Sequence, residues 1–148
     1  MDTYKTFITE VFNKPYKWEW EDRQKMDNAV FSELSNEYRV KFKELASQKY
    51  VYIAKLTMND STEMTGLNDE FKVLATCMEI MEEFLREVEP TALQFKGSTS
   101  RHVEAYKRLM KYFGPKFSKF GYGYKLAGND IRITSNSNIV ISNNEPKE

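Results

Sequence analysis

Apolar and polar side chains alternate along the first part of the chain, and this alternation constrains the fold more than any other feature. In residues 16–20 and again in residues 38–42, every second side chain is aromatic or aliphatic. Because successive side chains of a β-strand point to opposite faces, this period predicts strands that bury one face. The apolar run of residues 29–34 predicts another strand, and residues 49–58, apolar on both faces, are typical of a strand in the middle of a sheet. Four such strands joined by short turns predict an antiparallel meander.

The second half of the chain changes to the spacing of helices. In residues 70–88, apolar side chains recur every three to four positions and cover more than half of the helix circumference. Leu93 and Phe95 then predict a short strand. A second apolar stripe in residues 103–113 predicts another helix, which we expect to kink or end at Gly114–Pro115 because proline removes a backbone donor.

The closing segments complete an α+β pattern. Residues 122–126 and 131–133 predict a hairpin, and residues 135–148 predict a polar C-terminal tail. The order β-β-β-β-α-β-α-β-β predicts the four-stranded meander followed by α-β-α-β-β, with the helices packed on one face of the sheet. A chain of 148 residues has the length of one domain, so we expect a single α+β domain over residues 1–134.

Rare residue types and the lack of long apolar segments exclude several classes of protein. Cys77 and His102 are the only cysteine and the only histidine, which rules out a disulfide framework and argues against a histidine metal site within one chain. No apolar run reaches the roughly 20 residues that span a bilayer, and the N-terminus lacks the apolar stretch of a signal peptide. We therefore expect a cytoplasmic protein with no metal, no cofactor and no membrane partner.

The formal net charge is zero, but the charges are unevenly distributed along the chain. Residues 60–90 carry nine acids and two bases, a net charge of −7, whereas residues 91–125 carry eight bases and one acid, a net charge of +7. Such asymmetry is typical of an interaction surface. It is equally typical of two neighbouring elements that attract each other, and the sequence leaves both interpretations open.

The basic segment contains the strongest candidate for a binding site. Phe95–His102 predicts a strand, a small polar loop and a helix start, where backbone N–H groups, hydroxyls and basic side chains can hold an anion. The same serines are common helix caps, which is the structural alternative. On the following helix, Arg101, Lys107, Arg108 and Lys111 lie on one basic arc. The alternative is a solvated face, or a face complementary to the acidic helix of residues 70–88. The predicted anion- or nucleic-acid-binding residues are Lys96, Ser98, Ser100, Arg101, Lys107, Arg108 and Lys111.

Two other patterns have an ordinary structural interpretation. Glu79, Glu83 and Glu87 line one helix face, where they could hold a hard cation. No second carboxylate cluster converges on them, so we expect a solvated face. Trp18 and Trp20 share one strand face and are expected in the core. If they were exposed, they would form a platform for bases or for a partner.

No set of side chains predicts catalysis. His102 lies four residues from Ser98, but no acid is placed to orient the imidazole and no oxyanion hole is evident. We expect His102 to cap or pack the helix, and Cys77 to be an inert thiol within the apolar stripe. The sequence thus predicts no catalytic residue.

Three motifs follow one another along the chain. They are Lys-Pro-Tyr-Lys-Trp-Glu-Trp at 14–20, a Phe-x-Val-x-Ala-Thr helix at 71–76, and Arg-x4-Tyr-x-Arg-Leu at 101–109. Together with the strand between the last two, they resemble a family of small proteins of tailed bacteriophages over about residues 10–134. The chain departs from the family pattern where Ala105 replaces leucine and Phe-Lys-Gly replaces Phe-Ser-Ala. The resemblance implies a phage product in the bacterial host cytoplasm. Because the family has no assigned function, it supplies no catalytic residue.

These observations predict a non-enzymatic phage accessory protein that binds a phosphate-rich or acidic partner through the basic helix. The partner would be nucleic acid, or a host or phage protein. One alternative is an oligomeric structural or assembly protein of the virion, because the meander has open edges and aromatic faces. The second alternative is an enzyme acting on phosphate esters, with Arg101 and Ser98 as phosphate ligands, although a base, a nucleophile or a metal set is missing from the pattern.

Overall fold

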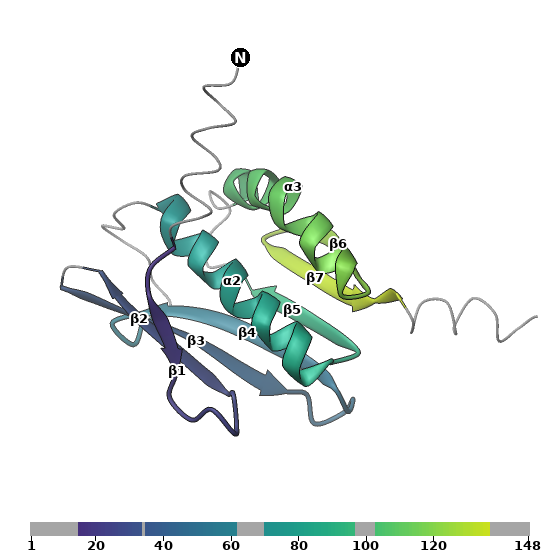
Figure 1. Ribbon diagram of the computed structural model, residues 1–148, viewed down its shortest axis with the longest axis horizontal. Coiled ribbons are helices and arrows are strands. Elements are labelled where there is room, and N and C mark those ends of the chain that lie inside the picture. Colours follow the sequence, from purple (N-terminus) through teal and green to yellow (C-terminus); the bar gives the residue numbers. More distant parts are fainter. Residues whose placement is uncertain (1–14, 34, 62–69, 97–102, 137–148) are drawn as a thin grey trace, which may run out of the picture.

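A seven-stranded mixed sheet with two helices on one of its faces forms the framework of the protein (Figure 1). The computed structural model describes residues 15–33, 35–61, 70–96 and 103–136. In chain order, the elements are β1 (Trp18–Trp20), β2 (Asn28–Glu33), β3 (Asn36–Glu44), β4 (Val51–Met58), α2 (Glu70–Val88), β5 (Ala92–Lys96), α3 (Val103–Lys119), β6 (Tyr122–Ala127) and β7 (Asp130–Ser135). The α+β class predicted from the sequence is confirmed.

The strand order β1-β2-β3-β4-β5-β7-β6 shows how the predicted meander is extended. Strands β1 to β4 pair antiparallel in chain order, and β4 is the central strand of the sheet, as its apolar composition predicts. β4 then pairs in parallel with β5, and β7 lies between β5 and β6. The meander is therefore one part of a mixed sheet. The connection through α2 explains this, because a helical crossover brings the next strand back in the same direction.

The hydrophobic core lies between the sheet and the helices. On β3, the side chains of Tyr38, Val40 and Phe42 are buried, whereas the residues between them are exposed or half-buried. The ring of Phe84 in α2 stacks on that of Phe42, with ring centroids 4.0 Å apart. Cys77 is fully buried in α2, and this burial raises the pKa of its thiol. Cys77 is thus a core residue, as predicted, and is held in the unreactive thiol form.

Helix α3 continues through Gly114 and Pro115, so the prediction that the helix could end at this point is wrong. Phe113 and Phe117 lie four residues apart on the same helix face, and both are buried. Burial of the two rings offsets the hydrogen bond that the proline removes. Gly114 also allows close packing against β6, because a Cβ atom at this position would lie 2.7 Å from Cε1 of Tyr124.

Tyr122, at the start of β6, ties this strand to the segment between α2 and β5. Its phenol donates a buried hydrogen bond of 2.7 Å to the backbone carbonyl of Pro90. Burial raises the pKa of Tyr122 to about 12, and the negative charge of Glu89 adds to the shift. The folded state therefore favours the neutral phenol, whereas a tyrosine in the unfolded chain ionises near pH 10.

We predict that the free energy of unfolding falls as the pH rises from about 10 to about 12, because the unfolded state loses the phenolic proton first. The contribution of Tyr122 is complete below the unfolded pKa and is lost as the pH rises through the folded pKa. Tyr122→Phe removes the part of this pH dependence that Tyr122 contributes, and it removes the hydrogen bond, at a cost of about 0.5–1.5 kcal/mol at neutral pH. The pKa of Tyr38 is also raised to about 12, so a smaller alkaline loss of stability remains. Urea unfolding of both proteins at neutral and alkaline pH measures both effects. Tyr124→Phe, on the same strand but exposed, is the control. An unchanged alkaline loss of stability in Tyr122→Phe would contradict the prediction.

Candidate functional site

The residues predicted to bind an anion do not all share one surface. Four of them lie on described elements and have exposed side chains: Lys96 at the end of β5, and Lys107, Arg108 and Lys111 on α3. Three lie outside the described residues: Ser98, Ser100 and Arg101. Because its neighbour Phe95 is buried on the helix side of the sheet, Lys96 points to the opposite face. The structure thus separates Lys96 from the basic arc of α3.

The basic arc of α3 is exposed, but much of it is engaged locally. The Lys107 ammonium lies 3.4 Å from the carboxylate of Glu104, one turn earlier in the same helix. The Arg108 guanidinium lies 5.9 Å from the ring centroid of Phe71 in α2. Exposed contacts of this kind contribute little to stability. Two of the three described bases of the arc therefore have a partner within the protein, and the arc alone is a modest source of positive potential.

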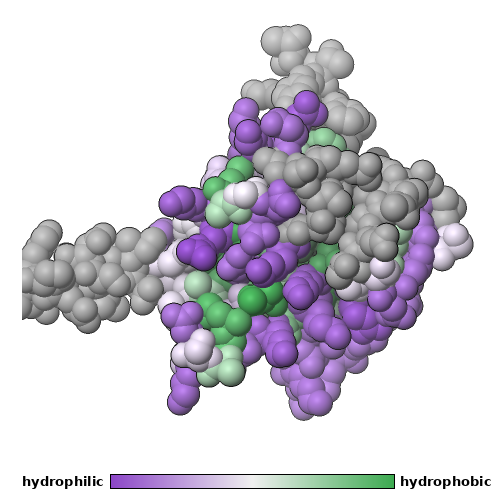
Figure 2. Space-filling model, turned by 180° about the vertical axis from the view of Figure 1, so that it is seen from behind, coloured by the Kyte–Doolittle hydropathy of each residue, from purple (hydrophilic) through white to green (hydrophobic). Residues whose placement is uncertain are grey.

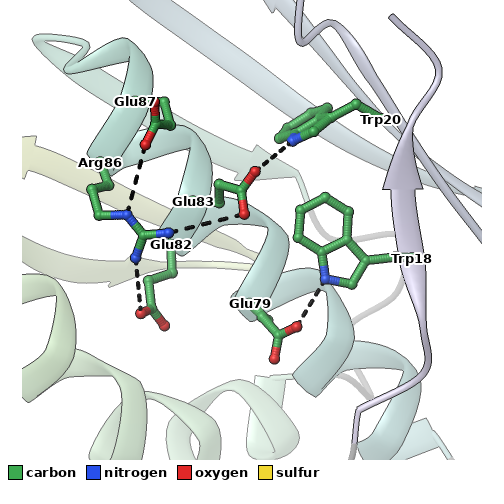
Figure 3. A network of polar contacts seen from close by, with 7 residues as sticks. All are labelled: Trp18, Trp20, Glu79, Glu82, Glu83, Arg86 and Glu87. Atoms are coloured by element: carbon green, nitrogen blue, oxygen red, sulfur yellow. Dashed lines mark hydrogen bonds and ion pairs between the residues drawn. The ribbon is translucent and has the colours of Figure 1, made fainter. Parts of the chain in front are cut away.

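The glutamates of α2 are held by the tryptophans of β1 (Figure 3). Trp18 donates from Nε1 to the Glu79 carboxylate, and Trp20 donates from Nε1 to Glu83, each at 2.8 Å. The two indole rings pack edge to face with centroids 5.3 Å apart, and Trp20 is 7% exposed, which confirms the predicted core position. The prediction of a solvated face is wrong for Glu79 and Glu83, because β1 lies over this side of α2.

Arg86 engages the remaining carboxylates of the α2 row. Its guanidinium nitrogens lie 3.8 Å from Glu82, 3.9 Å from Glu83 and 3.9 Å from Glu87 (Figure 3). These four carboxylates of α2 thus have hydrogen-bond or ion-pair partners on β1 and within α2. Across the ranges that the structure describes, no ion pair joins α2 to α3.

The face of the sheet that points away from the helices gathers basic side chains from five strands. Residues on β3 alternate between the core and this open face, so Arg39, Lys41 and Lys43 all point outward. The same alternation on the other strands adds one base each. The basic sheet face is defined here by Arg39, Lys41 and Lys43 on β3, Lys55 on β4, Lys96 on β5, Lys125 on β6 and Arg132 on β7.

The register of the sheet places several of these like charges directly opposite one another. Lys41 pairs with Lys55, and Lys55 pairs with Lys96, so three lysines form one row across β3, β4 and β5. Lys125 of β6 pairs with Arg132 of β7. Like charges in such positions destabilise a sheet. The repulsion is relieved when an anion binds between them, which makes this face a candidate anion-binding surface.

Over β2 to β4, the basic sheet face is hollowed. The hollow has a volume of about 860 Å³. Its lining includes the bases Arg39, Lys41, Lys43 and Lys55, the acids Glu44 and Asp60, and the apolar Ile53. Figure 2 shows this side of the molecule, where hydrophilic side chains cover most of the visible surface and apolar patches lie among them. The aliphatic stems of lysine side chains pack against such apolar patches while the ammonium groups stay in water.

Arg39 is the one base of this face with an acidic partner within the described residues. Its guanidinium donates to the carboxylate of Glu21, which follows β1. The side-chain hydrogen bond to Glu21 is the main cause that raises the pKa of Arg39, and the charges of Asp60 and Glu37 act in the same direction. The β1 side of the face is therefore partly neutralised. The other six bases are exposed and form no ion pair with any described residue.

The sequence contained a signal for only part of this surface. Arg39, Lys41 and Lys43 stand on the polar side of a predicted strand, so their common orientation follows from the period of the strand. The bases of β4 to β7 are isolated in the sequence. Only the strand order and register bring Lys55, and the bases of the later strands, next to Lys41.

Comparisons with known proteins add no assignment to these observations. No protein-family model matches the chain, and no curated protein matches it. The resemblance to small tailed-phage proteins therefore stays a prediction. Among the described residues, no group of three or more acidic, histidine or cysteine side chains is placed to hold a metal ion. Neither α2 nor α3 combines the length and the apolar character needed to cross a bilayer.

We predict that the Trp20–Glu83 hydrogen bond couples β1 to α2 by about 1–2 kcal/mol, because its acceptor is charged. Trp20→Phe and Glu83→Ala should each lower the free energy of unfolding, and the double variant should lose less than the sum of the two. Urea unfolding of the four proteins measures the coupling. A second cycle combines Trp20→Phe with Glu87→Ala, whose carboxylate contacts Arg86 and not Trp20. In this cycle the two losses of unfolding free energy should be additive. Additivity in the Trp20–Glu83 cycle as well would refute the coupling.

Proposed function

We propose that this protein is a non-enzymatic protein that binds nucleic acid through its basic sheet face. The observation that carries the proposal is the convergence of seven bases from five strands on one face, six of them without an ion-pair partner among the described residues. Phosphate groups of a polyanion would replace the like-charge repulsion of that face with attraction and release counterions. The role of a phage accessory protein in the bacterial cytoplasm is part of the proposal and is supported by the family resemblance alone.

The basic sheet face supports this function better than the arc of α3. It has seven bases against three described bases on the arc, and two of those three have local partners. The two surfaces lie on opposite sides of the sheet (Figure 1). Substituting the bases of each surface separately therefore shows which of the two surfaces binds nucleic acid.

We predict that nucleic-acid binding weakens steeply with salt, because each neutralised phosphate releases counterions. Lys41→Gln combined with Lys55→Gln should reduce the slope of log affinity against log salt concentration by roughly 1.4 to 2, about 0.7 to 1 for each lysine. At low salt, the double variant should bind about 10-fold more weakly. Fluorescence anisotropy with a labelled oligonucleotide measures both quantities.

The matched comparison for this prediction is Lys107→Gln combined with Lys111→Gln, which removes two exposed lysines from α3. This variant should keep the salt slope of the wild-type protein. Loss of binding in the α3 variant, with none in the sheet variant, would move the site to α3. Binding that ignores both salt and substitution would reject the proposed function.

Glu21 competes with phosphate for Arg39, so its removal should strengthen binding. We predict that Glu21→Gln raises the affinity for nucleic acid by roughly 3- to 10-fold at low salt, because it frees a base of the face and removes a negative charge. Glu19→Gln is the control, since it removes the same charge two residues earlier, within β1, without releasing an ion-pair partner. Equal gains in the two variants would show that Arg39 is not a phosphate ligand.

A further inference from the structure

We infer that the nucleic acid bound by this protein is single-stranded and crosses the basic sheet face at a steep angle to the strands, held by its phosphates. The inference rests on the proposed function and specifies its ligand. It follows from how the bases are distributed over the strands, from what lies on each side of the sheet, and from which residue types occupy the open face.

The bases form one track across the sheet. Beyond β3, each strand presents a single base on the open face, in the spatial order Lys55, Lys96, Arg132 and Lys125. Lys55 and Lys96 are register partners, as are Arg132 and Lys125. Arg132 pairs with Gln94, so the track shifts by two residues between β5 and β7. Neighbouring strands lie about 4.8 Å apart, so the track from β3 to β6 is roughly 19 Å long. A track that is one residue wide on four strands matches one phosphate backbone.

A duplex fits this surface poorly. It presents two phosphate backbones separated by grooves roughly 6 to 12 Å wide, and its readers insert a helix or a β-ribbon into a groove. Both described helices lie on the other side of the sheet (Figure 1). A duplex is also stiff, and bending it costs energy. A single strand is flexible enough to enter the hollow over β2 to β4 and to follow the twist of the sheet.

The open face contacts the backbone and does not read the bases. Proteins that bind the bases of single-stranded nucleic acid stack them on aromatic side chains. On β2 to β7, no open-face position of the described strands holds an aromatic residue, because the alternation directs the rings of these strands toward the helices. The Gln94 amide, a group that could read a base edge, donates to the Asp130 carboxylate at 2.7 Å. Affinity should therefore depend weakly on base identity.

The test measures anisotropy with labelled single strands of about 15 nucleotides, in thymine-only, adenine-only and mixed sequence, and with the duplex of the mixed sequence. The full chain is titrated at salt concentrations from about 50 to about 200 mM. We expect the mixed single strand to bind at least about 10-fold more tightly than its duplex, and the three single strands to agree within about 3-fold. The salt slope for a single strand should lie between roughly −3 and −5, since at most seven bases contribute about 0.7 each.

A variant with three bases of the track substituted, the track variant, tests where the nucleic-acid strand crosses the sheet. Lys96→Gln, Arg132→Gln and Lys125→Gln together should weaken single-strand binding by about 10-fold or more and flatten its salt slope. The triple α3 variant Lys107→Gln, Arg108→Gln and Lys111→Gln is the comparison, and circular dichroism confirms that both are folded.

The outcomes separate the inference from the proposed function. Absence of binding to any oligonucleotide at low salt would reject both. Duplex binding as tight as single-strand binding, or a preference of more than about 10-fold for one base, would reject the inference and leave nucleic-acid binding in place. Retention of single-strand affinity in the track variant would show that the strand does not cross β5 to β6.

Discussion

Burial of a single face of the sheet is the constraint on which the rest of this structure depends. The two helices cover one side, and every strand meets them with alternate side chains, as Tyr38, Val40 and Phe42 do on β3. The side chains in between point to the opposite face of the sheet, which the helices do not cover. A base placed at any of these positions therefore joins the same surface as the bases of the neighbouring strands. The basic sheet face is a consequence of this division.

The acidic helix does not cancel this charge because its carboxylates are already engaged. Trp18 and Trp20 donate to Glu79 and Glu83 from one side, and Arg86 contacts the row from within α2. These contacts lie on the helix side of the sheet. Two carboxylates of the segment with a net charge of −7 thus serve the packing of β1 against α2. On the opposite face, Arg39 pairs with Glu21, and the other six bases form no ion pair with a described residue.

The sequence predicted the local elements well because local periodicity depends on few residues. The alternation around Trp18 and around Val40 predicted two half-buried strands, and the stripe of residues 70–88 coincides with α2. Prediction from the sequence failed where contacts with residues distant in the chain determine the structure. Pro115 does not end α3, because burial of Phe117 against the core outweighs the lost hydrogen bond. Glu83 is not a solvated residue, because Trp20 reaches it from 63 positions away in the chain.

The candidate site shows the same division. The site predicted from the sequence, Lys96 to Arg101 and the basic arc of α3, was inferred from neighbours along the chain. Of its residues on described elements, only Lys96 belongs to the basic sheet face. From the amino-acid order alone follow the α+β class, the four first strands, the two helices and the outward orientation of Arg39, Lys41 and Lys43, because each depends on spacing within one element. The placement of Lys55, Lys96, Arg132 and Lys125 beside them was settled by the folded sheet, since hydrogen-bonded register between distant strands determines which outward side chains become neighbours.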